Sequence, residues 1–243
     1  KKQKHQRTVG GCLNYNYKIN LINQLNSKSV SLVIFSTFFD LEILKYCKKN
    51  NIKTILVSNI LRDSHREAIK LRGYYDFFDI VFSLQDLGNV KKISKNEIFV
   101  SPFKPSIQTT NKRKHNFYNI LICCGGAGRS SSIDFFKIMK KIVNKFEILD
   151  NSVKFTLILG NSKEKFKSSN LNTLKWSKNF SKLVTEHDLI ISEAGYFTMV
   201  ELLFSDIISI IIPGDRRIDN QEIRSVRMEK FGFGYFYFPM ENW

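Results

Sequence analysis

Short apolar runs alternate with amphipathic stretches along the first hundred residues. The runs at 29–37, 53–59, 78–84 and 97–101 predict buried strands, and the stretches at 40–50 and 64–75 predict helices. The first of these helices would place Leu41, Leu44 and Cys47 on one face. Strands this uniformly apolar, joined by helices, are typical of a parallel sheet covered on both faces.

The same alternation returns in the second half of the chain. Strands are predicted at 118–124, 153–160, 174–177, 188–192, 208–213 and 233–238, and helices at 131–146, 180–187, 197–205 and 220–231. Between the halves, "PFKPSIQTTNKRKHN" (102–116) breaks the pattern with two prolines and a charge run, as a linker does. We therefore predict an α/β fold with two Rossmann-like, doubly wound parallel-sheet domains at 1–103 and 118–243, joined by a linker at 104–117.

The chain is strongly basic, with 38 Lys and Arg against 22 Asp and Glu and a net charge of +16. Such a surface attracts polyanions, but the lysines are scattered, so a merely solvated basic surface and an anionic membrane surface both remain open. Nucleic acid is disfavoured because no nucleic-acid-binding motif is present. No apolar stretch approaches the roughly 20 residues of a membrane helix. We expect a cytoplasmic protein that is soluble or, at most, peripheral on the inner face of a membrane.

The cysteines offer no chemistry. Cys12, Cys47, Cys123 and Cys124 form no C-x-x-C pair, and no clustered histidine completes a zinc site. The sequence therefore predicts neither a disulfide framework nor a metal centre, and no cofactor.

A glycine-rich turn follows the strand at 118–124. In "CCGGAGRSSS" (123–132), Gly125, Gly126 and Gly128 let a ligand approach the backbone, and Ser130 to Ser132 can cap the helix that follows, whose free amides would bind an anion. The spacing matches neither a Walker A loop nor G-x-G-x-x-G. A plain tight turn is the alternative interpretation.

A second turn of this kind follows the strand at 188–192. In "SEAGYFTMVELL" (192–203), Gly195 precedes a helix, and Glu201 is a carboxylate among apolar neighbours. A carboxylate there can accept two hydrogen bonds from a vicinal diol, as acidic residues do for ribose. The alternatives are a charge on a partly exposed helix face, or a carboxylate held by a buried Lys or Arg.

Residues 118–238 resemble the carboxyl-terminal donor-binding domain of the GT-B glycosyltransferases of family 28, which includes the transferase that adds N-acetylglucosamine to a lipid-linked peptidoglycan precursor. The likeness rests on "ILICCGGAGRSS" and on the block from "DLIISEAGYFTMVELL" to "EKFGFG", with its Ser-x-x-Gly turn, its helical Glu and its later Gln. The order and spacing over about fifty residues carry more weight than any one motif.

The resemblance implies roles for individual residues. Glu201 would hold the ribose hydroxyls, and the amides at Gly125, Gly126 and Gly128 would bind the diphosphate. Gln221 would contact the transferred sugar, and Lys104, in "VSPFKPS", would face the phosphates. Two positions depart from the family: Ala127 replaces a frequent serine, whose hydroxyl contact Ser130 would have to supply, and Arg224 replaces a common asparagine in the donor site.

The first half resembles the family less closely. "SNILRDSHREAIKLRGYYDFFDIVFSLQD" is similar to the last α/β units of the acceptor domain, but the usual opening strand and glycine-rich loop are absent, and the chain stops at "MENW" before the usual closing helices. We expect an incomplete first domain and a fragment or abbreviated chain. His65 is a candidate catalytic base, with a solvated helix-start histidine as the alternative.

The resemblance implies a glycosyltransferase that moves a hexose or N-acetylhexosamine from a nucleotide sugar, with UDP favoured, to a lipid-linked or surface-polysaccharide acceptor. No D-x-D motif is present, which fits a metal-independent reaction. Two alternatives stay open: a nucleotide-sugar hydrolase on the same fold, and a noncatalytic nucleotide-sugar-binding subunit that needs a partner chain. The sequence fixes neither the sugar, nor the acceptor, nor the oligomeric state.

Overall fold

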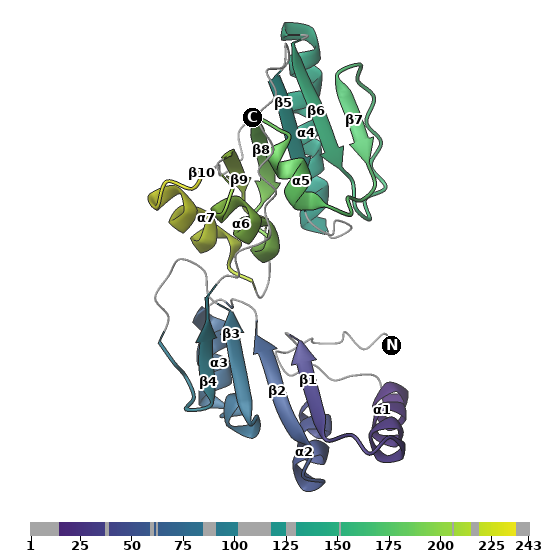
Figure 1. The fold of residues 1–243 in the computed structure, drawn as a ribbon, viewed down its shortest axis with the longest axis vertical. Helices are drawn as coiled ribbons and strands as arrows, with labels where there is room; N and C mark the ends of the chain where they lie inside the picture. Colours follow the sequence, from purple (N-terminus) through teal and green to yellow (C-terminus); the bar gives the residue numbers. More distant parts are fainter. Residues whose placement is uncertain are drawn as a thin grey trace, which may run out of the picture. The chain divides into compact units, whose positions relative to one another are not determined.

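The structure is a computed structural model that describes residues 15–36, 39–58, 61, 63–84, 91–101, 118–124, 130–150, 152–205, 207–214 and 219–236. The chain divides into two compact units, Lys1–Pro102 and Phe103–Trp243 (Figure 1). The predicted linker at 104–117 lies outside the described residues.

The first unit contains a four-stranded parallel sheet in the order β1-β2-β3-β4. Its elements are α1 (Tyr15–Ser27), β1 (Leu32–Ser36), α2 (Leu41–Lys49), β2 (Lys53–Ser58), α3 (Asp63–Leu71), the 3₁₀ turn η1 (Tyr74–Phe77), β3 (Ile80–Leu84) and β4 (Glu97–Val100). The side chain of Asp40 caps α2 by accepting from two backbone amides. Strand order follows chain order, so every crossover in this sheet advances in one direction.

The helices of the first unit pack on one face of its sheet. Leu25 of α1 joins Ile43 and Cys47 of α2 in a cluster with Val33 and Phe35 of β1. On the same face, Arg66 of α3 reaches the carboxylate of Glu97 on β4. These contacts belong to the core of the unit.

The second unit contains a six-stranded parallel sheet in the order β10-β9-β8-β5-β6-β7. Its elements are β5 (Tyr118–Cys123), α4 (Ser130–Leu149), β6 (Val153–Ile158), β7 (Leu171–Leu174), α5 (Phe180–Thr185), β8 (Leu189–Glu193), α6 (Tyr196–Leu203), β9 (Ile208–Ile212), α7 (Gln221–Lys230) and β10 (Tyr235–Phe236). Strands are added on one side of β5 as far as β7 and then on its other side from β8 onward. This reversal is the hallmark of a doubly wound sheet.

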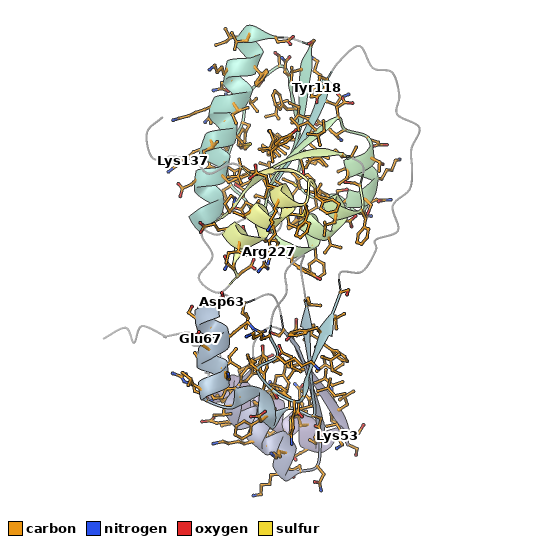
Figure 2. The ribbon with its side chains drawn as sticks, turned by 90° about the vertical axis from the view of Figure 1, so that its left-hand side faces the viewer. Lys53, Asp63, Glu67, Tyr118, Lys137 and Arg227 are labelled. Atoms are coloured by element: carbon orange, nitrogen blue, oxygen red, sulfur yellow. The ribbon has the colours of Figure 1, made fainter. Side chains whose placement is uncertain are left out.

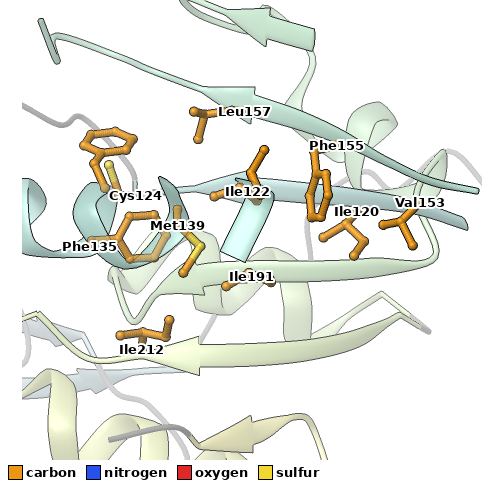
Figure 3. Close-up of a cluster of buried hydrophobic side chains, with 12 residues drawn as sticks. Ile120, Ile122, Cys124, Phe135, Met139, Val153, Phe155, Leu157, Ile191 and Ile212 are labelled. Carbon is orange, nitrogen blue, oxygen red and sulfur yellow. The ribbon is translucent and has the colours of Figure 1, made fainter. Parts of the chain in front are cut away.

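Both faces of the second sheet are covered. Met139 and Phe136 of α4 pack with Ile120, Ile122 and Phe155 on one face (Figure 3). The alternate residues, Leu121, Ile190 and Ile211, are fully buried as well, on the opposite face, which lies under α5 and α6 (Figure 1). The prediction of two Rossmann-like parallel-sheet α/β domains is confirmed.

Two details of the predicted elements were wrong. β7 occupies 171–174, not 174–177, because its pairing with β6 sets the register and joins Leu171 to Phe155. α1 was not predicted at all. Its sequence, "YNYKINLINQLNS", is rich in residues of modest helix propensity, and packing of Leu25 against α2 supports it.

No helix in the described ranges is long and apolar enough to cross a membrane.

Candidate functional site

The reversal of strand order in the second unit lies between β5 and β8. The last residues paired there are Cys123 and Ser192, and both strands end within one residue of this pair. In open α/β sheets, ligands bind beyond the carboxyl ends of the strands at such a switch point. Both glycine-containing turns predicted from the sequence follow these two strands, so the candidate site lies at this edge.

The amino terminus of α6 lies at this edge and has no side-chain cap. α5 and α7 are capped by Asn179 and Asn220, whose side chains accept hydrogen bonds from the first turn. α6 begins instead at Gly195, which supplies no such bond. The first amides of α6 therefore keep their capacity to bind an anion.

Gly195 is not required by the fold that the structure describes. Its φ of −65° and ψ of 139° suit any residue, so the glycine relieves no backbone strain. A β-carbon added there would meet nothing closer than the Thr198 hydroxyl at 3.9 Å. A glycine that neither dihedral angles nor packing demand fits a place where a ligand approaches the backbone.

Glu201 lies in the second turn of α6 and is half-buried. Its carboxylate accepts a hydrogen bond from the Ser181 hydroxyl of α5, with an oxygen–oxygen distance of 2.8 Å. No lysine or arginine of the described ranges forms an ion pair with it, so the alternative of a carboxylate held by a buried cation finds no support there. The remaining acceptor positions of the carboxylate can take further donors.

Arg224 of α7 is 2% exposed and contacts the turn between β8 and α6. Its guanidinium donates to the carbonyl of Ala194 and to Asp219, at 2.5 Å from Oδ1. The ring centroid of Tyr196 lies 5.9 Å from the guanidinium carbon. This side chain links α7 to the residue directly before Gly195.

Gln221, at the start of α7, is 4% exposed and contacts the segment that follows β9. Its Oε1 accepts from the amide of Gly214 at 2.8 Å. A β-carbon on Gly214 would lie 3.1 Å from Oε1 of Glu193 and 3.3 Å from Oε1 of Gln221, so only glycine fits between these two side chains without displacing them. The side-chain carbonyl of Gln221 is thus engaged within the protein.

Four of the predicted site residues lie on the β8–α6 turn, α6 and α7: Gly195, Glu201, Gln221 and Arg224. Lys104, Gly125, Gly126 and Gly128 lie outside the described residues, and Ser130 begins α4 with a side chain that is not described. His65 is half-buried in the first turn of α3, in the other unit. The roles assigned to all of these residues stay predictions.

Two residues of this edge escaped the sequence analysis. Glu193 is 3% exposed at the last position of β8, and Asp219 is the carboxylate that holds Arg224. The signal for Glu193 was present, since a carboxylate directly after "DLIIS" has to be buried with its strand. Asp219 gave no comparable sign, because its pairing with a residue five positions later depends on the loop before α7.

In the described ranges, no group of three or more His, Cys, Asp or Glu side chains lies close enough to hold a metal ion.

Burial raises the pKa of the Cys123 thiol well above its usual range, so this residue at the switch point is not a thiolate at neutral pH.

The fold is that of the GT-B glycosyltransferases. MurG from Acinetobacter baumannii matches 93% of this chain and 68% of its own length with a TM-score of 0.60 at 13% identity. The glycosyltransferase SnogD from Streptomyces nogalater matches 89% of this chain and 62% of its own length with a TM-score of 0.59 at 14% identity. At such identities the likeness concerns the fold alone.

The family follows from the sequence. The glycosyltransferase family 28 C-terminal domain matches residues 111–237, slightly more than half of the chain, and the chain belongs to this family. A curated relative from Thermosipho africanus (strain TCF52B), UDP-N-acetylglucosamine--N-acetylmuramyl-(pentapeptide) pyrophosphoryl-undecaprenol N-acetylglucosamine transferase, is 30% identical over 116 residues. The match covers 47% of this chain and 33% of that relative, so the chain spans only part of the length of its relatives.

Proposed function

We propose that the second unit binds the nucleotide-sugar donor of a glycosyltransferase at the β5–β8 switch point. The observation that carries the proposal is that α6 presents an uncapped amino terminus and, in its second turn, the carboxylate of Glu201. The first suits a diphosphate and the second suits the ribose diol. Glu201 lies five positions after Tyr196 in the helix, a rise of about 7.5 Å, which is comparable to the separation of diphosphate and ribose hydroxyls in one nucleotide.

The donor in this proposal is a UDP-linked hexose or N-acetylhexosamine, and the acceptor is a lipid-linked or surface polysaccharide. The name of the Thermosipho africanus relative, which contains both a UDP-sugar and an undecaprenol-linked acceptor, supports these classes. Gln221 would turn its amide nitrogen toward the sugar, since its carbonyl is engaged by Gly214. Lys104, Gly125, Gly126, Gly128 and Ser130 complete the proposed contacts to the diphosphate.

The proposed reaction needs no metal. In its inverting form, an acceptor hydroxyl attacks the anomeric carbon while a base takes the hydroxyl proton, and the bond to the diphosphate breaks. The amides of α6 and basic side chains stabilise the departing nucleoside diphosphate. The base is not assigned, and His65 is a candidate for it. Arg224 acts as a positioning residue, because it holds the carbonyl of Ala194 next to the turn that binds phosphate.

Donor binding is tested by calorimetry of the 243-residue chain with UDP, TDP and GDP. Binding of UDP in preference to the others is expected, and the absence of binding by all three to a folded sample would remove the proposal.

Chromatography of UDP-N-acetylglucosamine incubations then separates a transferase, a hydrolase and a noncatalytic subunit. Release of UDP only with a lipid-linked acceptor indicates a transferase, release without it a hydrolase, and binding without release a noncatalytic subunit. Unchanged turnover in excess EDTA is expected.

The basic surface is proposed to dock on an anionic membrane that carries the acceptor. Sedimentation with vesicles should then be stronger for anionic than for neutral lipid and should fall with added salt, because each engaged Lys or Arg contributes about 1 kcal/mol. Equal sedimentation with both vesicle types would contradict this docking.

A further inference from the structure

Phe197, in the first turn of α6, is an aromatic side chain that the described residues leave 75% exposed. A single exposed apolar residue is ordinary on a protein surface. This one lies at the carboxyl edge of the second sheet, beside Gly195 and the uncapped first amides of α6. In Figure 2 this edge is the end of the unit toward Arg227 and away from Tyr118, the first residue of β5. Ligands of such sheets bind at this edge, in sites lined by aromatic and apolar side chains.

A row of contacts connects the ring of Phe197 to α7. This ring meets the ring of Tyr196 edge to face, with the two centroids 5.5 Å apart. The centroid of the Tyr196 ring lies in turn 5.9 Å from the guanidinium carbon of Arg224. Arg224 follows Gln221 by one turn of α7, and both are buried. Phe197 is therefore the exposed end of a row of side chains that begins at the buried start of α7.

The direction of the ring follows from its place on the helix. Helical side chains lean toward the amino terminus, so the ring of Phe197 covers the space in front of the first amides of α6. Glu201 lies four positions later on the same face, about 6 Å further along the helix axis. The two side chains thus flank one stretch of the α6 surface, with the aromatic ring on its amino-terminal side.

The transferred sugar is the part of the proposed donor that suits this ring. With the ribose at Glu201 and the diphosphate at the first amides of α6, the nucleobase extends from the ribose away from the diphosphate. The sugar extends beyond the diphosphate, on the side of Phe197. The face of an aromatic ring carries a partial negative charge, so it does not favour the diphosphate but attracts the C–H bonds of a hexose ring. Gln221, the proposed polar contact of the sugar, lies at the other end of the same row.

We propose that Phe197 is a specificity-determining residue for the donor, and that its ring packs against the C–H face of the transferred hexose. This role rests on the proposed function, because it requires the donor to bind at α6. The two can be tested separately, since UDP lacks the sugar. Binding of UDP reports on the proposed function, and the affinity for UDP-N-acetylglucosamine relative to UDP reports on Phe197.

Calorimetry of the 243-residue chain with both ligands tests the role of the ring. Phe197→Ala should weaken binding of UDP-N-acetylglucosamine about three- to ten-fold, because the contact with the ring is lost. It should leave the UDP affinity and the thermal midpoint unchanged, because the side chain is exposed. Phe197→Trp keeps an aromatic ring and should retain the affinity for the UDP-sugar. The matched control is Phe204→Ala, at the carboxyl-terminal cap of α6 and about 10 Å further along the axis, which should change neither affinity.

The outcomes separate this role from the proposed function. An unchanged affinity of Phe197→Ala for UDP-N-acetylglucosamine would overturn the role of the ring. An equal loss for UDP and for the UDP-sugar would overturn it as well, because the ring would then act on the nucleotide or on the fold. If the folded wild-type chain bound neither ligand, the proposed function and the role of Phe197 would fail together.

Fluorine NMR tests the position of the sugar directly. 4-Fluorophenylalanine is placed at position 197 and, in a control protein, at position 204. Saturating UDP-N-acetylglucosamine should shift the resonance of the probe at 197 more than saturating UDP does, because the sugar packs on the ring, and it should leave the probe at 204 unshifted. An equal shift of the probe at 197 with both ligands would overturn the proposal.

Discussion

In the described ranges, each unit buries an arginine against a carboxylate, but the two pairs differ in what surrounds them. In the first unit, Arg66 meets Glu97 with both terminal nitrogens, at 3.0 and 3.2 Å. Glu97 is 0% exposed, and it also accepts from the hydroxyl of Ser83 and the amide of Ile93. Arg66 donates further to the carbonyl of Lys91. The network joins α3, β3, β4 and the loop before β4.

Arg224 in the second unit belongs to a more open arrangement. Its partner, Asp219, keeps 30% of its side chain exposed, and its second contact is the carbonyl of Ala194 at the carboxyl end of β8. Glu97, by contrast, lies at the amino end of β4. The comparison teaches that a buried ion pair away from the carboxyl edge of a sheet serves the fold, whereas one next to the switch point also holds the backbone that we propose binds the donor.

The largest expected effect separates these two arginines. Arg66→Met leaves Glu97 buried without its cation and should cost about 3–5 kcal/mol of stability in the first unit. Arg224→Met should cost less, about 1–3 kcal/mol, because water can reach Asp219, and it should weaken UDP binding in addition. Denaturation followed by hydrogen exchange of each unit, with UDP calorimetry, gives both quantities. The double variant Arg66→Met/Glu97→Leu should regain most of the loss. Equal losses for the two single variants would break the comparison.

Substitution of Glu201 should give the next largest effect, and it should lower UDP affinity more than the free energy of unfolding. Glu201→Ala should cost about 2–4 kcal/mol of UDP affinity, because two charge-assisted hydrogen bonds to the ribose are lost. Stability should fall by only about 1 kcal/mol, the contribution of the bond from Ser181. Ser181→Ala is the matched control, since it removes that bond and keeps the carboxylate.

A 2′-deoxy nucleotide sharpens the test of Glu201. The wild-type chain should bind 2′-deoxy-UDP more weakly than UDP, whereas the Ala variant should not discriminate between them. Equal discrimination by both proteins would show that Glu201 does not hold the ribose.

Gly195 should show opposite signs for stability and for binding. Gly195→Ala suits the extended backbone at this position and meets no close neighbour, so it should raise stability by about 0.4–1 kcal/mol. UDP affinity should fall, because the added β-carbon occupies the space beside the first amides of α6. Thermal denaturation and calorimetry measure the two effects. An unchanged UDP affinity would remove Gly195 from the site and leave only an uncapped helix there.

The fold was largely predictable because its signals are local. Runs such as "KTILVS" and "ISIII" can be buried only as central parallel strands, and the side chains of Asp40, Asn179 and Asn220 mark helix starts. β7 was displaced because its sequence, "LNTL", is scarcely apolar, and pairing with β6 alone fixes it. The strand order was not readable from any residue, since it depends on contacts far apart in the chain.

The site was predictable to a smaller extent. Gly195 and Glu201 follow a buried strand at a readable spacing, and the structure places both on the β8–α6 turn and α6. The burial of Arg224 was not readable, since a basic residue on "QEIRSVRMEK" suggests an exposed face. Arg224 is buried because its guanidinium donates to the carbonyl of Ala194, which is thirty residues away in the sequence. The engagement of Gln221 by Gly214 is likewise a tertiary contact.

The smallest effect distinguishes the two units by pH. Burial lowers the pKa of His187, whose Nδ1 donates to the carbonyl of Leu183, from its ordinary 6.5. The unfolded chain therefore takes up a proton first as the pH falls, and stability of the second unit declines from about pH 6.5 down to the folded pKa. In the first unit, a hydrogen bond from the amide of Thr54 lowers the pKa of Asp79 below 3.8, so the contribution of Asp79 to stability persists at pH 5 and is lost only in stronger acid.

Urea denaturation at pH 8 and pH 5 reports on the second unit through tryptophan fluorescence, because Trp176 and Trp243 both belong to it. His187→Asn should flatten the dependence between these two pH values, and an equal slope in the variant would assign the effect to another group.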